Sequence, residues 1–151
     1  ILPAVAKHKR LLDVGSGGGL PGIPLAIVLA SAEPDFRVTM LDTIAKKTTF
    51  IRQVIGELRL TNAMVVTERV ENYRPEATFD AVVSRAFSDM KDFVDGAGHL
   101  CAPHGRMLAM KGVHPLDEIA RLSIGYEVEE VSLLQVPQVD GQRHLVVIKK
   151  S

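Results

Sequence analysis

The chain has 151 residues, of which 46% are hydrophobic and 24% are charged. This balance is typical of one globular domain and excludes a disordered or membrane-embedded chain. Because 18 basic residues balance 18 acidic ones, net charge gives no support for a polyanionic partner, and any nucleic-acid contact must come from local clustering.

Three observations favour a cytoplasmic location without a membrane partner. The longest apolar stretch, residues 23–32, is too short to span a bilayer. The first residues carry no signal-peptide pattern, and we interpret residue 1 as a cut in a longer chain. A single cysteine, Cys101, excludes an internal disulfide and suits a reducing compartment. We expect one domain over residues 1–151.

Apolar runs alternate with helix-period segments, as in a parallel sheet covered on both faces. A strand is predicted at residues 10–14, followed by glycines and a helix from Leu20 or Pro21 to about Ala32. Pro21 is tolerated only in the first helical turn, and Pro24 either tightens that turn or moves the helix start later. A strand at 37–41 follows, and then a helix with one apolar face: Ile44, Thr48, Ile51, Ile55 and Leu58.

The second half continues the alternation. Strands are predicted at 63–67 and 79–84, and the next helix has the apolar face Phe87, Met90, Val94, Ala97 and Cys101. A fifth strand at 106–111 and a short helix from 116 to about 123 follow. Two last strands, about 126–136 and 143–149, meet across Asp140-Gly141. The apolar run 145–148 predicts that the last strand is inserted, antiparallel, between its two predecessors.

The strongest local signal is residues 13–19, Asp-Val-Gly-Ser-Gly-Gly-Gly, between a strand and a helix. Glycines there, Gly15 and Gly17 above all, let the backbone approach a ligand closely. An open parallel sheet binds its ligand outside the carboxyl ends of its strands, and Asp42 at the next strand end can bind both ribose hydroxyls of an adenosine. Glycines alone would also fit a tight turn, but the whole arrangement indicates a nucleoside site.

Two details favour S-adenosyl-L-methionine (SAM) over NAD. Leu20 stands where the dinucleotide fingerprint requires Gly or Ala. Asp13 can face the ammonium of the methionine moiety, and NAD has no such cation. The predicted fold is therefore that of a class I SAM-dependent methyltransferase, a Rossmann-like three-layer α/β sandwich whose seven-stranded sheet ends in an antiparallel hairpin. Nucleotide-binding dehydrogenase halves do not end in this way.

Two further strand ends contribute side chains to the predicted crevice. Residues 68–71 include Glu71, which is equally compatible with a solvated surface charge. Residues 84–87, Ser-Arg-Ala-Phe, place Arg85 at the tip of a buried strand. The structural alternative for Arg85 is an ion pair with Glu71 or Asp42.

The sequence resembles the RsmG (GidB) methyltransferases, which methylate N7 of a guanine in 16S rRNA of the small subunit. The matching residues are 13–25, 41–42, 46–47, 50–52, 69–71, 84–86, 134–137 and 143–148. The Leu-Pro-Gly-Ile-Pro tail at 20–24 and the Ser-Arg-Ala-Phe segment are absent from ordinary class I methyltransferases. The resemblance extends from about residue 10 to residue 150.

This resemblance implies that SAM binds at Gly15, Leu20, Val70-Glu71 and Arg85, with Asp42 on the ribose. It also implies a helical segment before the glycine strand, of which these residues contain almost nothing. The expected partner is 16S rRNA within the 30S subunit, and no metal is expected.

The residue chemistry agrees with attack by guanine N7, whose lone pair needs no general base. None of the five histidines falls at a predicted strand end, and we expect each at the surface. Methylation of a pyrimidine C5 needs a cysteine nucleophile, whereas Cys101 is predicted in the core. Methylation of an adenine amine commonly uses a Pro-Pro-aromatic run where this chain has Ser-Arg-Ala-Phe. Arg85 can instead orient the guanine or a phosphate.

Of the basic residues, Arg69 and Lys111 also lie at strand ends and are the predicted RNA contacts. Two other functions stay open. A small-molecule methyltransferase would need an apolar cap, yet the chain has no Trp and no insertion for one. A SAM-binding module without catalysis is not excluded by any residue.

Overall fold

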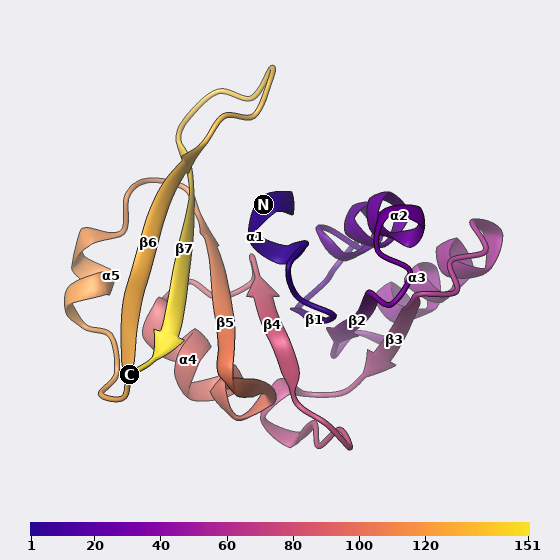
Figure 1. The fold of residues 1–151 in the computed structure, drawn as a ribbon, viewed down its shortest axis with the longest axis horizontal. Helices are drawn as coiled ribbons and strands as arrows, with labels where there is room; N and C mark the ends of the chain where they lie inside the picture. Colours follow the sequence, from indigo (N-terminus) through magenta and orange to yellow (C-terminus); the bar gives the residue numbers. More distant parts are fainter.

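Seven strands form one sheet in the order β3-β2-β1-β4-β5-β7-β6 in the computed structural model, which describes residues 1–151 (Figure 1). Strands β1 to β5 are parallel, and β7 is antiparallel to both β5 and β6. The predicted antiparallel insertion of the last strand between its two predecessors is confirmed. The strands are β1 (Arg10–Val14), β2 (Arg37–Asp42), β3 (Ala63–Thr67), β4 (Phe79–Ser84), β5 (Cys101–Lys111), β6 (Tyr126–Leu134) and β7 (Arg143–Lys150).

Strand β7 is buried on both faces because four apolar residues in a row, 145–148, lie between β5 and β6. Strand β6 forms the sheet edge, and its residues are all exposed or half-buried. The connection between β6 and β7, residues 135–142, projects beyond the rest of the sheet (Figure 1). It is longer than a two-residue hairpin turn, although Gly141 has the positive φ of +88° that a turn glycine permits.

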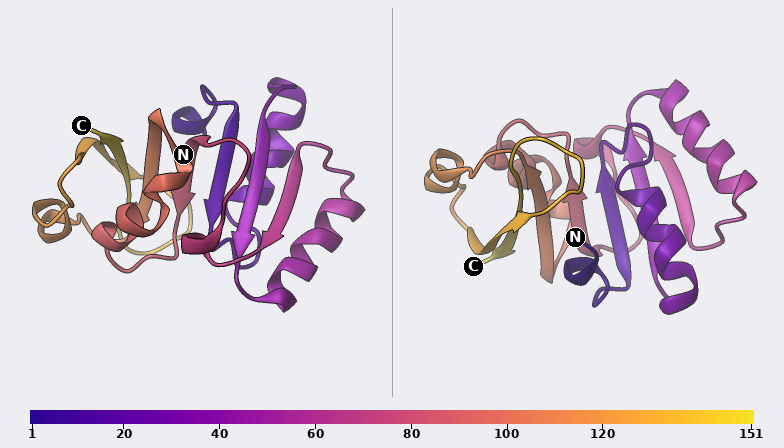
Figure 2. Two further views of the ribbon diagram at one scale, coloured as in Figure 1. Left: turned by 90° about the horizontal axis from the view of Figure 1, so that it is seen from below. Right: turned by 90° about the horizontal axis from the view of Figure 1, so that it is seen from above.

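Helices cover both faces, so the predicted three-layer sandwich is confirmed. One face packs α1 (Leu2–Val5), α2 (Gly22–Ala32) and α3 (Ala45–Glu57), and the other packs α4 (Met90–Ala97) and α5 (Leu116–Ala120). Figure 2 shows α1 and α2 in front of the strands from one side and α4 in front from the other. Two short 3-10 helices complete the chain, η1 (Val70–Asn72) and η2 (Gly98–Leu100). None of the helices combines the length and apolar character that a membrane span requires.

Two predicted element boundaries were wrong near β5. The helix predicted from Phe87 to Cys101 begins only at Met90, because the Asp89 side chain caps it by accepting the amide of Lys91. Cys101 is not on a helix: it is the first residue of β5, although it is buried as expected. Strand β5 starts five residues earlier than the predicted 106, because an irregularity in its pairing with β4 accommodates residues 102–105.

Helix α2 starts at Gly22, later than Leu20 or Pro21. This start places Pro24 in the first turn, where its missing N–H breaks no helical hydrogen bond. Residues 15–21 therefore form a loop at the carboxyl end of β1.

Candidate active site

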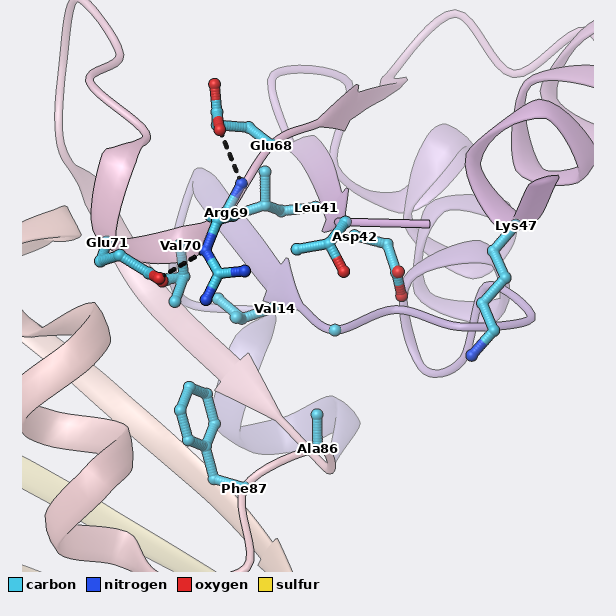
Figure 3. A pocket seen from close by; sticks show the side chains of 12 residues that line it. Val14, Leu41, Asp42, Lys47, Glu68, Arg69, Val70, Glu71, Ala86 and Phe87 are labelled. Carbon is cyan, nitrogen blue, oxygen red and sulfur yellow. Dashed lines mark hydrogen bonds and ion pairs between the residues drawn. The ribbon is translucent and has the colours of Figure 1, made fainter. Parts of the chain in front are cut away.

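A cleft of about 380 Å³ opens where β1, β2, β3 and the segment after β4 meet (Figure 3). The strand ends coincide because Val14 is in register with Leu41 and Ser84, and Asp42 is in register with Thr67. Twelve residues line the cleft: Val14, Gly15, Leu41, Asp42, Thr43, Lys47, Glu68, Arg69, Val70, Glu71, Ala86 and Phe87. The cleft lies where an open parallel sheet is expected to bind its ligand.

Gly15 lines the cleft and packs directly against the segment after β4. It has a φ of +71°, and a Cβ added there would collide with the Cβ of Ala86. Its amide donates to the carbonyl of Leu41 at 2.8 Å, which fixes the loop against β2. Only glycine adopts this backbone conformation without strain and also leaves room for the Ala86 side chain.

Asp42 holds the glycine loop as well as lining the cleft. Its Oδ2 accepts the Gly17 amide at 2.9 Å and its Oδ1 accepts the Ile44 amide at 3.0 Å, and the residue is 8% exposed. Each carboxylate oxygen has a second lone pair. The side chain can therefore accept further hydrogen bonds from a ligand without releasing the loop.

Asp13 was expected to face the ammonium of a ligand, but it does not line the cleft. Its Oδ2 accepts the Gly22 amide at 2.9 Å, and its Oδ1 is buried without a hydrogen-bond partner. Burial raises the pKa of this carboxyl to about 7, against the lowering effect of the Gly22 hydrogen bond. Asp13 therefore attaches the first residue of α2 to β1.

Arg69 and Glu71 form an ion pair on the rim of the cleft, with Nε 2.7 Å from Oε1 (Figure 3). Both side chains are more than half exposed. Hydrogen bonds from its own backbone amide and from Arg69 lower the pKa of Glu71. Glu71 and its neighbour Val70 lie on η1, so this short helix brings both to the cleft.

Arg85 is exposed and lies between two anchored residues. The Ser84 hydroxyl donates to the Val14 carbonyl at 2.8 Å and accepts the Ala86 amide at 3.0 Å. The six ion pairs of the molecule do not include Arg85, so the alternative of a pair with Glu71 or Asp42 is not found. Arg85 itself does not line the cleft, although the next two residues do.

Lys111, a predicted RNA contact, is turned inward. Its side chain is 11% exposed, and its ammonium lies 2.9 Å from both Glu118 Oε2 and the Ser88 carbonyl. These acceptors occupy the ammonium within the chain, so we do not carry Lys111 forward as an RNA contact.

The cleft brings together four of the predicted cofactor residues, Gly15, Asp42, Val70 and Glu71. Gly17 and Leu20 lie outside it: the Gly17 amide binds Asp42, and Leu20 is 47% exposed. Glu68 lines the cleft with the rest of the predicted segment 68–71. Two other lining residues, Thr43 and Lys47, were not predicted from the sequence. Thr43 directly follows β2, so the strand-end rule could have found it, whereas Lys47 comes from the first turn of α3 and no strand end points to it.

No histidine lines the cleft. The prediction that every histidine lies at the surface was wrong for His144, which is 6% exposed on β7 with Nδ1 2.7 Å from the Gly112 carbonyl. The alternating pattern of an edge strand would expose it, but β7 is buried on both faces. No group of three or more His, Cys, Asp or Glu side chains is placed to hold a metal ion.

The fold is similar to solved methyltransferases of low sequence identity. A magnesium protoporphyrin IX methyltransferase from Synechocystis with bound SAM matches with a TM-score of 0.74 at 14% identity, over 99% of this chain and 74% of that one. TrmN from Thermus thermophilus matches with a TM-score of 0.72 at 19% identity, over 95% of this chain and 44% of that one. These similarities establish the class I methyltransferase fold.

Closer relatives share one name. Ribosomal RNA small subunit methyltransferase G of Aromatoleum aromaticum is 53% identical over 151 residues, which is all of this chain and 72% of that protein. The protein of the same name from Pseudomonas aeruginosa is 48% identical over 151 residues, which is 69% of its length. The family model described as rRNA small subunit methyltransferase G matches residues 1–146. The chain therefore belongs to the GidB family.

Proposed function

We propose that this chain transfers a methyl group from SAM to N7 of a guanine in the 16S rRNA of the small ribosomal subunit. The observation that carries the proposal is the 53% identity, over the whole chain, to a relative named Ribosomal RNA small subunit methyltransferase G. The position of the cleft at the strand ends supports it, since that is where the fold binds its ligand.

The residues of the cleft fit SAM. Its volume of about 380 Å³ is in the usual range for small-molecule sites. The Asp42 carboxylate has free lone pairs for ribose hydroxyls, and Gly15 lines the cleft with backbone alone. Glu71 is ionised and lies on the rim, where it can accept hydrogen bonds from the ligand. When bound, SAM supplies a methyl group on a positively charged sulfur.

The proposed reaction requires orientation rather than proton transfer. The lone pair of guanine N7 forms the new N–C bond while the S–C bond to the methyl group breaks, and the electron pair of that bond stays on sulfur. The positive charge passes to the guanine ring, and no proton is lost. A cleft without a histidine is compatible with this chemistry. Correct alignment of two reactants can contribute roughly 7–11 kcal/mol to catalysis.

Arg85 is the residue that we assign to orientation of the guanine. It is exposed beside the cleft, and its guanidinium is free of ion pairs within the chain. A guanidinium can donate to guanine O6 or to a phosphate oxygen. Arg69 on the rim is the remaining candidate for an RNA contact. The proposed setting is the cytoplasm, with the 30S subunit as the partner.

Labelled SAM and 30S subunits without a methyl group at the target guanine test the proposal. We expect stoichiometric incorporation, with 7-methylguanosine as the labelled nucleoside after nuclease digestion and mass spectrometry. Parallel reactions with protein-free 16S rRNA test whether the assembled particle is needed. Binding of the demethylated cofactor without transfer to either RNA would instead indicate a module without catalysis. Label on any atom other than guanine N7 would contradict the proposed acceptor.

A further inference from the structure

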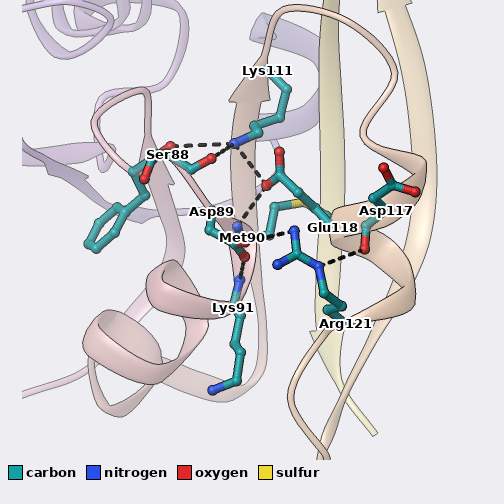
Figure 4. Close-up of polar contacts among 9 residues, drawn as sticks. Ser88, Asp89, Met90, Lys91, Lys111, Asp117, Glu118 and Arg121 are labelled. Atoms are coloured by element: carbon teal, nitrogen blue, oxygen red, sulfur yellow. Dashed lines mark hydrogen bonds and ion pairs between the residues drawn. The ribbon is translucent and has the colours of Figure 1, made fainter.

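A network of charges, with a partly buried ion pair at its centre, packs against the segment between β4 and α4 (Figure 4). Lys111, the last residue of β5, donates to the carbonyls of Ser88 at 2.9 Å and Phe87 at 3.4 Å. Its third partner is Glu118 of α5, whose Oε2 lies 2.9 Å from the ammonium. An ammonium has three protons to donate, so the site satisfies it completely.

Glu118 connects the same network to α4. Its Oε2 also accepts the amide of Met90, the first residue of that helix, at 2.8 Å. The neighbouring Asp89 caps the next amide and forms an ion pair with Arg121 at 3.1 Å, as Figure 4 shows. The Lys111 and Glu118 side chains are only 11% and 19% exposed, so water screens this pair weakly.

The segment between β4 and α4 is thus held at both ends. The Ser84 hydroxyl fixes its beginning to the Val14 carbonyl on β1, and Lys111 fixes its end to β5. Between these anchors, Ala86 and Phe87 line the cleft, and Ala86 contacts Gly15. The position of Arg85 relative to the cleft therefore depends on both anchors.

We propose that Lys111 and Glu118 are positioning residues for methyl transfer, because they hold residues 85–88 where Arg85 meets the incoming guanine. This inference rests on the proposed function. A buried ion pair is often no more stabilising than well-packed apolar side chains. Its location behind the active-site segment, with two carbonyls of that segment as partners, gives it a role in geometry.

The competing role for Lys111 is a direct contact with an RNA phosphate. The two roles differ in what a Lys111→Met substitution changes. Loss of a phosphate contact raises KM for the RNA. It also reduces the slope of log K for binding against log salt concentration by about one. Loss of a positioning contact lowers kcat, because a reactant displaced by about 1 Å can cost on the order of 100-fold in rate.

The test compares Lys111→Met with Lys91→Met, which removes a cation from an exposed ion pair on α4. Hydrogen exchange at residues 85–90, affinity for the demethylated cofactor, and kcat and KM for 30S subunits are measured on each folded protein. For Lys111→Met we expect faster exchange at 85–90 and a kcat reduced about 10- to 100-fold, with KM and its salt dependence unchanged. Lys91→Met should behave as wild type.

Glu118→Gln keeps an acceptor for the Met90 amide but loses the charge, so it provides the test if Lys111→Met does not fold. It should give the same changes to a smaller extent. Unchanged exchange at 85–90, or an unchanged kcat with a raised KM, would overturn the positioning role. A wild-type chain that binds the demethylated cofactor but methylates no 30S subunits contradicts the proposed function itself. The exchange rates would still decide whether the network holds the segment.

Discussion

Two aspartates on either side of the glycine loop are buried but bonded differently. Asp42 accepts two backbone amides and lines the cleft. Asp13 accepts one amide, has one oxygen without a partner, and lies outside the cleft. Burial with one oxygen unpartnered favours the protonated form of the Asp13 carboxyl and raises its pKa. The same residue type thus lines the cleft at one position and lies behind it at the other.

Asp42→Asn should weaken binding of SAM and of its demethylated product. The amide keeps a single acceptor oxygen, so the backbone amides and the ribose hydroxyls compete for it. Loss of a hydrogen bond to a charged acceptor costs about 1.5–3 kcal/mol, which is roughly a 10- to 150-fold rise in Kd. Titration calorimetry on the folded variant measures this, with the exposed Asp35→Asn as control. Unchanged affinity would remove Asp42 from the cofactor site.

Asp13 should make the unfolding free energy fall as pH rises between about 4 and 7. Its pKa is about 7 in the folded chain, against an ordinary value of 3.8, so across this window the folded state binds the proton that the unfolded state has lost. The loss over the whole window is roughly 4 kcal/mol. Denaturant unfolding of wild type and Asp13→Asn at a series of pH values isolates the effect. If the difference between the two proteins does not change with pH, the buried carboxyl titrates normally.

At the scale of elements, the glycine loop and the segment after β4 form one packed unit. Gly15 meets Ala86 closely, whereas a Cβ at Gly18 would meet nothing within 4 Å and Gly18 has no positive φ. Within the glycine cluster, Gly15 is therefore required by its φ and by its contact with Ala86, whereas neither reason applies to Gly18. The sequence pattern alone does not separate them, because the contact involves residues 71 positions apart.

Gly15→Ala should destabilise the fold, whereas Gly18→Ala should not. A left-handed backbone costs a non-glycine residue about 1–2 kcal/mol, and the collision with Ala86 adds to this. Adding Ala86→Gly to Gly15→Ala should restore the part of the loss that the collision causes, but not the backbone part. Thermal midpoints of the three variants, with cofactor affinity, check this. Equal stability of Gly15→Ala and wild type would mean that the loop takes another conformation.

Element boundaries were predictable where local chemistry decides them. The strand limits of β1, β3 and β4 follow from apolar runs, and all three match. The predicted helix over Phe87–Cys101 was too long because the 3-4 spacing continues through segments that are not α-helical. The Asp89 cap was visible in the sequence, but the bonds from Lys111 and Glu118 that fix the preceding segment were not.

At the scale of the molecule, the sheet order determines which residues share the site. Parallel strands β1, β2, β3 and β4 end together, so the sequence could predict Asp42, Val70 and Glu71 at one edge. It could not predict that Lys111 turns inward, because its partner Glu118 lies on a five-residue helix beyond the next loop. Side-chain direction depends on tertiary contacts, and strand ends alone do not specify it.

We assign Arg85 to orientation of the guanine, at a site that needs no general base. The most direct measurement is methyl transfer to 30S subunits by wild type and Arg85→Lys, with thermal midpoint and cofactor affinity on the same preparations. Lysine keeps the charge but loses the planar, forked donor. We expect Arg85→Lys to fold normally and to have a lower kcat, because its side chain makes no ion pair within the chain. Full turnover by Arg85→Lys would contradict the claim.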